Sequence, residues 1–206
     1  MKKLLFFSLI WLLSLNLVSA LEISGEYDTN VIVYDVNNSI ELILDISNAS
    51  AGKYNLYTLA DISIKPSEIF TIPESFIEKK FIVTAKDNLD VDGYYSFTYI
   101  LNHRGVEKVN GKMLIKLMNI EDVIEVSSDS IDPASGKISF YVQNKESVNL
   151  KNLTAEFSSI LFQTTKTFDL GANEKLEIFV DVDEEKLKKT KAGVYIIESL
   201  FQTKGG

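Results

Sequence analysis

The chain contains no cysteine and only one histidine, His103. Small exported domains often depend on disulfides, so stability here must come from the burial of apolar side chains. Without cysteine there are no catalytic thiols, zinc–thiolate sites or iron–sulfur clusters. The single histidine, expected in a turn beside Arg104 and Gly105, cannot assemble a multi-histidine metal site or a histidine-based catalytic triad.

A glycine-rich phosphate loop is also missing. The 29 Asp and Glu residues are numerous enough for the paired carboxylates of a glycoside hydrolase. They fall on predicted strand faces and turns, however, with no insertion that would form a pocket. We therefore predict a non-catalytic protein that requires no cofactor.

Basic residues are in the minority, and the formal net charge is −8. Removing residues 1–20, which include Lys2 and Lys3, leaves 19 basic and 29 acidic residues, a net charge of −10. Such a field repels polyanions, so nucleic acid and anionic membrane surfaces are not expected partners.

Residues 1–20 have the pattern of a secretory signal peptide. A basic start precedes an apolar stretch, and Val18-Ser19-Ala20 offers small residues for cleavage before Leu21. The alternative is an uncleaved anchor, although the apolar run is shorter than the roughly 20 residues that a spanning helix prefers. No cysteine follows, which excludes a bacterial lipoprotein. We expect an exported protein, extracellular or at the cell surface (periplasmic if the host has an outer membrane), without membrane insertion after cleavage.

Alternation of apolar and polar residues dominates the rest of the chain. In "SIELILDIS" Ile40, Leu42, Leu44 and Ile46 fall on one face, and the same period recurs in "KISFYVQN" and "KLEIFVD". Such segments are typical of half-buried antiparallel strands. A helical pattern is weak, and "DEEKLKKTK" is predicted to be a solvated loop or a single turn. The 186 residues after the signal segment suit two immunoglobulin-sized sandwiches.

The two halves of the exported chain resemble each other. "FTIPESFIEKKFIV" aligns with "FDLGANEKLEIFV", which matches Phe70 with Phe168 and Phe81 with Phe179 at an offset of 98. "NNSIELILDISN" and "ASGKISFYVQN" match more loosely. We therefore predict an all-β protein in which one Ig-like antiparallel β-sandwich occurs twice, at residues 21–118 and 119–206, with a short linker near residue 119.

Each copy has a Gly-x-Tyr step that leads into a long strand, from Gly93 to Tyr95 and from Gly193 to Tyr195. In immunoglobulin-like sandwiches a tyrosine at this corner hydrogen-bonds to nearby backbone. We predict this structural role for Tyr95 and Tyr195, with an ordinary strand tyrosine as the alternative.

The first copy continues beyond the point where the second copy stops. After a turn predicted at residues 101–105, the first copy reads "VEKVNGKMLIKLMN", which suits a closing strand, whereas only Gly206 follows the equivalent residues 201–205. The second sandwich is expected to lack its final strand and to leave an open edge that invites pairing. Three explanations remain open: the sequence is part of a longer protein, a neighbouring subunit donates the strand, or residues 119–131 fold over the gap.

Together these motifs resemble the cell-adhesion-related (CARDB-type) domains, which are Ig-like modules of archaeal and bacterial surface proteins. The shared pattern is an early strand that ends in Asn ("DISN", "YVQN"), an "F-x-[IL]" step and the Gly-x-Tyr strand. One departure is the turn "IPES", where the family favours a glycine-containing turn; the second copy has "LGAN". The resemblance implies adhesive, spacer or envelope-forming units and brings no catalytic residues.

A weak metal hypothesis concerns "DNLDVDG", where Asn88, Asp90 and Asp92 alternate as in part of a calcium loop. The twelfth position counted from Asn88 is Tyr99, not the glutamate that an EF-hand requires. The equivalent stretch of the second copy, "KKTKAG", is basic. A solvated acidic turn is the preferred interpretation.

Three Asn-x-Ser/Thr sequons begin at Asn37, Asn48 and Asn152, which are candidates either for N-glycosylation or for ordinary turn formation. Tyr54 and Tyr57 are candidates for a sugar-stacking surface, with strand packing as the alternative.

The sequence thus favours a structural or adhesive protein of the cell envelope. Its expected partners are other envelope proteins or glycans, with self-association through the open edge of the second domain as a further option. The alternatives are a carbohydrate-binding accessory module and a periplasmic chaperone with two Ig-like domains. The acidic balance and the missing strand count against the chaperone.

Overall fold

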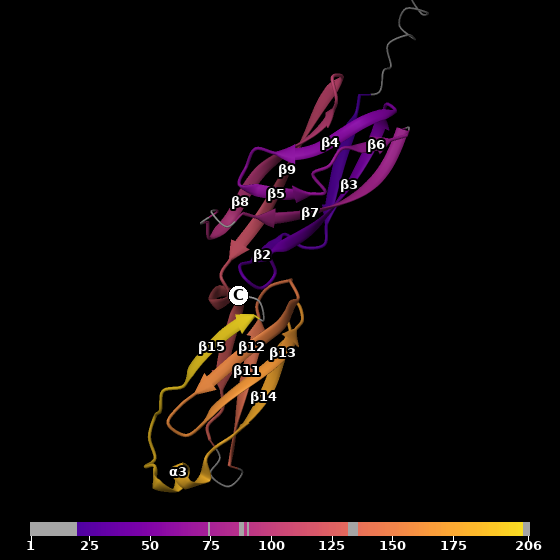
Figure 1. Cartoon of the computed structure of the whole chain (residues 1–206). Coiled ribbons are helices and arrows are strands. Elements are labelled where there is room, and N and C mark those ends of the chain that lie inside the picture. Colours follow the sequence, from indigo (N-terminus) through magenta and orange to yellow (C-terminus); the bar gives the residue numbers. More distant parts are fainter. Residues whose placement is uncertain (1–19, 74, 87–88, 90, 132–135, 204–206) are drawn as a thin grey trace, which may run out of the picture.

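The computed structural model describes residues 20–206 except 74, 87–88, 90, 132–135 and 204–206. Figure 1 shows two β-sandwiches arranged end to end. Strands form both of them, and the helices within the described residues are two short ones. The predicted class, an all-β chain with two tandem Ig-like antiparallel sandwiches, is confirmed.

The first sandwich consists of one sheet in the order β1-β3-β7-β5 and a second in the order β2-β9-β8-β4-β6. Neighbouring strands are antiparallel except β2, which runs parallel to β9. The strands are β1 (Glu22–Tyr27), β2 (Val31–Val33), β3 (Ser39–Ala49), β4 (Gly52–Thr58), β5 (Ile62–Lys65), β6 (Phe70–Ile72), β7 (Ser75–Ala85), β8 (Gly93–His103) and β9 (Glu107–Met118).

The second sandwich has sheets in the orders β10-β11-β14 and β13-β12-β15. Its strands are β10 (Ile124–Ser128), β11 (Lys137–Asn144), β12 (Leu150–Ser158), β13 (Gln163–Leu170), β14 (Lys175–Asp181) and β15 (Glu198–Thr203). Helix α2 (Ile120–Val123) connects the sandwiches. The segment predicted as a loop or single turn contains the short helix α3 (Glu184–Lys189), because the carboxylate of its N-cap Asp183 accepts the Lys186 N–H at 3.0 Å.

The period-two pattern explains both cores. Ile40, Leu42, Leu44 and Ile46 alternate along β3 and are at most 1% exposed, as are Phe140 and Val142 on β11. Successive side chains of a strand point to opposite faces, so the alternation places one apolar row between the sheets. Burying each such side chain contributes roughly 1.5–3 kcal/mol.

The internal repeat is visible in the strand register. Leu56 on β4 lies opposite Leu101 on β8, and Ala155 on β12 lies opposite Phe201 on β15, so the two strand pairs share one register. Residues 101–103 and 201–203 therefore continue β8 and β15, and the turn predicted at 101–105 is confined to residues 104–106.

One part of the sequence alignment is wrong. Phe70 and Phe168 are equivalent, because they face Tyr54 and Leu153 at matching positions. Phe81 is buried in the first core, whereas Phe179 is exposed. A shift of one residue along a strand turns a side chain to the opposite face, so these two phenylalanines are not equivalent.

Asn144, at the end of β11, is a fully buried polar residue. Its Nδ2 donates to the carbonyls of Val148 at 2.6 Å and Gly171 at 2.9 Å. Its Oδ1 accepts the Glu146 N–H at 3.0 Å. The side chain thereby holds the turn after β11 against the turn before β14.

Replacing Asn144 with Ala is expected to lower the free energy of unfolding by about 2 kcal/mol, because the buried Val148 carbonyl and the Glu146 N–H lose their partner and the Gly171 carbonyl keeps only the Glu174 N–H. Denaturant unfolding measures the change. Gln143→Ala, an exposed change one residue away on β11, is the matched control and should cost less than about 0.5 kcal/mol. Equal losses in the two variants would contradict the assigned role.

Candidate functional site

The joint between the sandwiches is built around the three-residue strand β2. Its side chains alternate between the two cores: Ile32 packs in the first, whereas Val31 and Val33 pack in the second. Met118, the last residue of β9, and Val123 on α2 lie in the same second core. The strand thus belongs to one sheet and contributes to both sandwiches.

Polar contacts reinforce this joint. The Tyr34 N–H donates to the Met118 carbonyl at 3.0 Å, and the Lys145 N–H donates to the Val123 carbonyl at 2.9 Å. An ion pair joins Lys116 Nζ on β9 to Glu146 Oε1 after β11 at 2.7 Å, with side chains only 25% and 18% exposed. The hydrogen bond to Glu146 raises the pKa of Lys116.

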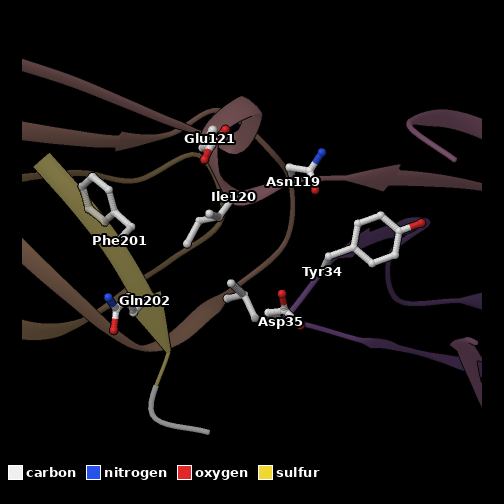
Figure 2. Close-up of a pocket in the computed structure, with 8 residues that line it drawn as sticks. Tyr34, Asp35, Asn119, Ile120, Glu121, Phe201 and Gln202 are labelled. Carbon is white, nitrogen blue, oxygen red and sulfur yellow. The ribbon is translucent and has the colours of Figure 1, made fainter. Parts of the chain in front are cut away.

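A cleft of about 540 Å³ opens beside the joint. Figure 2 shows Tyr34 and Asp35 on one side, Asn119 to Glu121 around the start of α2, and Phe201 and Gln202 on β15. Asp35 and Glu121 are the charged residues among the eight that line it, and none of the eight is Lys or Arg. This cleft, which we call the elbow cleft, is therefore acidic and reaches the end of β15.

β15 forms the edge of its sheet, in the position that β8 holds in the first sandwich. In the first sandwich β4 covers one side of β8 and β9 covers the other. β12 takes the place of β4 beside β15. Within the described ranges no strand lies in the place of β9, so one side of β15 is unpaired.

The chain before β15 shows the effect of this open side. In the first sandwich β4 reaches only residues 99–103 of β8, so residues 93–98 are held by β9 alone. The equivalent residues 193–197 have no such neighbour and belong to no strand. Val194 and Ile196 there are 102% and 82% exposed, and Leu200 on β15 is 53% exposed. These positions correspond to Tyr94, Ser96 and Ile100 on the outer face of β8, where Tyr94 is 67% exposed even though β9 pairs with it.

One explanation offered for the gap is wrong. Residues 119–131 do not cover β15, because residues 124–128 form β10 and pair with β11 in the opposite sheet. The Asp129 N–H continues that pairing by donating to the Ser139 carbonyl at 3.0 Å.

The sugar-stacking hypothesis fails for Tyr54. Its ring is buried and stacked on His103 at a centroid distance of 4.3 Å, and its hydroxyl donates to the Ser50 carbonyl at 2.8 Å. Tyr57 is half-buried. His103 is the last residue of β8 and not part of the turn, and its buried Nδ1 has no hydrogen-bond partner among the described residues.

The two Gly-x-Tyr tyrosines lie in different settings. Tyr195 donates its hydroxyl to the Lys191 carbonyl, four residues upstream. Tyr95 is half-buried on β8, with its ring 6.4 Å from that of Phe97. In the first sandwich Tyr34 holds the segment before β8, because its hydroxyl lies 2.8 Å from the Leu89 carbonyl and 3.0 Å from the Val91 carbonyl. No sequence pattern indicates this role of Tyr34.

Of the proposed calcium residues, Asp92 is exposed, whereas Asn88 and Asp90 lie outside the described residues. In the part of the chain that the structure describes, no group of three or more acidic or histidine side chains is placed to hold a metal ion. The calcium site stays a hypothesis.

The sequon residues occupy turns and irregular strand positions. Asn48 and Asn152 are exposed and have φ angles of 55° and 54°, at bulges in β3 and β12. Asn37 is half-buried and pairs with Val33. Their glycosylation stays a prediction. Over the described ranges, no helix is long and apolar enough to cross a membrane.

No known protein-family model matches the sequence, and no curated protein matches it. Solved structures with a similar arrangement include a Porphyromonas gingivalis protein of unknown function (TM-score 0.33, 10% identity, covering 82% of this chain and 86% of that one). Another is the YadV chaperone, with a TM-score of 0.30 and 10% identity over 88% of this chain and 91% of that one. The periplasmic chaperone SfaE has a TM-score of 0.33 and 13% identity over 77% of this chain and 86% of that one. At these identities and scores the similarities identify no family.

The Lys116–Glu146 pair gives a test of the joint. Glu146→Gln is expected to lower the free energy of unfolding at neutral pH by about 1 kcal/mol, because the ion pair is only partly solvated. The pKa of Lys116 is raised in the folded protein. The stabilisation is therefore fully present below the ordinary lysine pKa of 10.5 and is lost as the pH rises through the folded value.

Denaturant unfolding across this pH range checks both statements. Glu41→Gln is the matched control, since Glu41 pairs with Lys80 at 2.9 Å but with side chains 38% and 61% exposed. Solvent screens that pair, so its loss should cost less than about 0.5 kcal/mol. A Glu146→Gln effect no larger than the control, or one that persists at high pH, would refute the role given to the joint pair.

Proposed function

We propose that this protein is a non-catalytic, exported structural or adhesive unit of the cell envelope in which the edge of β15 takes up one further strand. The observation that carries the proposal is the side of β15 with which no described strand pairs, together with residues 193–197, which belong to no strand. An edge of this kind presents a row of free N–H and C=O groups, which another extended chain pairs with readily.

The open side of β15 lacks the features that usually keep an edge strand from pairing with another chain. Edge strands commonly carry charges, proline or a bulge that discourages pairing. The segment 193–203 contains one charged residue, Glu198, and no proline. It also carries Val194 and Ile196, two of the most exposed apolar residues among those described. These features favour an edge that accepts a partner.

Two further features support an envelope role. The signal-like residues 1–20 and the resemblance to CARDB-type surface modules point to export and to adhesion or spacing. The joint at β2 links the sandwiches through shared core residues, which suits a unit that holds partners at a set separation.

A chaperone for exported subunits is the second candidate, which the two-sandwich architecture favours. Periplasmic pilus chaperones anchor the terminal carboxylate of a subunit with basic cleft residues. The elbow cleft of this protein carries Asp35 and Glu121 and no basic residue among its lining. Binding of a subunit strand at β15 would thus have to proceed without that anchor. The carbohydrate-binding alternative relied on Tyr54 and Tyr57 as a sugar-stacking surface, and Tyr54 is buried.

The double substitution Ile196→Lys with Leu200→Lys is expected to abolish capture of partner proteins from the envelope fraction of the organism that encodes the chain. Two lysines at the edge oppose the approach of another strand and remove its apolar contacts. Immobilised residues 21–206, treated with envelope extract and analysed by mass spectrometry, give the readout.

The control is Phe76→Lys with Ile82→Lys, which changes two exposed apolar residues of β7 in the first sandwich. This variant should capture the same proteins as the unchanged chain. Capture that survives the β15 substitutions, or that is lost only in the β7 control, would show that the open edge is not the functional surface.

A further inference from the structure

We infer that the outer face of the β2-β9-β8-β4-β6 sheet binds a linear acidic polysaccharide, whose carboxylates lie beside lysine side chains and whose hydroxyls hydrogen-bond to asparagine side chains between them. This face belongs to the first sandwich, so the inference goes beyond the further strand proposed for β15. It concerns the kind of envelope polymer to which the protein adheres.

Although the chain as a whole is negatively charged, the charges of the first sandwich are divided between its two outer faces. Residues 21–118 contain 14 acidic and 9 basic residues, so an even distribution would put more carboxylates than cations on each face. The outward positions of β4, β8 and β9 alternate with buried residues such as Leu56, Leu101 and Ile115. The charged residues at these outward positions are all lysines, namely Lys53, Lys108, Lys112 and Lys116. We call this surface the lysine face.

The outer face of the opposite sheet has the reverse charge. Its outward strand positions carry the carboxylates of Glu22, Glu26, Glu41, Asp45 and Glu78. The lysines on the same face are Lys65 and Lys80, and Lys80 is paired with Glu41 at 2.9 Å. An anionic polymer is therefore attracted to the lysine face and repelled from the other side of the same sandwich.

The lysines of β9 form a regular row. Lys108, Lys112 and Lys116 are four residues apart along the strand, which separates neighbouring cations by roughly 13 Å. Lys116 is held by Glu146 at 2.7 Å, whereas Lys108 and Lys112 are exposed and make no ion pair with any described residue. A polymer that carries charges at regular intervals and lies along β9 would meet these cations in turn.

Protection of an edge strand is the simpler explanation for two of these lysines. β2 pairs only with residues 116–118 of β9, and lysine commonly keeps such an edge from pairing with another chain. This explanation does not apply to Lys53, because β4 lies between β8 and β6. It also does not account for the opposite charges of the two outer faces.

The side chains among the lysines favour a sugar chain over an acidic polypeptide. Asn102 lies opposite Asn55, and its Nδ2 donates to the Asn55 Oδ1 at 3.0 Å. This bond leaves the Asn55 amide N–H groups and the Asn102 carbonyl oxygen available to sugar hydroxyls. Tyr57 and Tyr94 add aromatic surface on the same side, and Tyr94 is 67% exposed. Protein–protein interfaces, in contrast, are depleted in lysine.

The probe is polygalacturonate, a linear polymer of a uronic acid, added to the folded chain of residues 21–206. Isothermal titration calorimetry is expected to show saturable binding that weakens as salt is added, because salt screens exposed charges. Methyl-esterified polygalacturonate keeps the sugar chain without the charge and should bind about tenfold more weakly, since several charge contacts are lost together. Amide signals in NMR spectra should shift on β4, β8 and β9 and stay unchanged on β3 and β7.

Two double substitutions with equal change in net charge test the position of the site. Lys108→Gln with Lys112→Gln should weaken binding by about threefold to tenfold, because two exposed charge contacts are removed. Lys65→Gln with Lys80→Gln, on the opposite outer face, is the matched control and should bind like the unchanged chain. Thermal unfolding of each variant confirms that it is folded.

Equal losses in the two folded variants, or equal binding of the polymer and its methyl ester, overturn the inference. Failure of polygalacturonate to bind overturns it as well. If poly-L-glutamate binds as tightly as polygalacturonate, the occupant is an acidic polypeptide and the inference fails for the sugar chain. None of these outcomes depends on β15, whose role is tested separately by envelope capture.

Discussion

Backbone pairing along the Gly-x-Tyr strand is the constraint on which the rest of this structure depends. β8 and β15 match residue for residue against β4 and β12, yet β8 spans residues 93–103 and β15 only residues 198–203. Ordering a residue costs roughly 1–2 kcal/mol of conformational entropy, which ladder bonds and side-chain contacts must offset. β9 supplies that compensation for the first half of β8. Without such a neighbour, the equivalent residues 193–197 of the second sandwich belong to no strand.

The elbow cleft lies between the joint at β2 and the end of β15. α2 and the turn after β2 bring Asp35 and Glu121 to the cleft, and the end of β15 forms its opposite wall, with Phe201 and Gln202 (Figure 2). A strand laid along β15 in the place of β9 would begin near this cleft. The acidic residues of the cleft would then lie near the start of that strand.

Period-two alternation was enough to predict the strands of the two sandwiches, because burial on one face leaves a direct mark on a strand sequence. The repeat and the open edge were predicted from the alignment of the two halves. Alternation was not enough to fix register, since bulges such as the one between Ser47 and Ala49 shift the pairing without a signal in composition. The alignment of Phe81 with Phe179 failed because residue types alone did not show the one-residue offset that puts the two phenylalanines on opposite faces of their strands. Tyr54 and His103 were misplaced because their burial depends on contacts between strands distant in sequence. The run "VIV" of β2 did hold a signal: three consecutive apolar residues fit a strand buried on both faces.

The alternation within β2 also determines how the molecule responds to bending. Tilting one sandwich against the other would pull Val31 and Val33 out of the second core, at roughly 1.5–3 kcal/mol for each side chain. Thermal energy is too small to expose these side chains often, so the two sandwiches move together as one rigid body. A force applied to one sandwich is then transmitted through the buried side chains of the joint to the far end of the other.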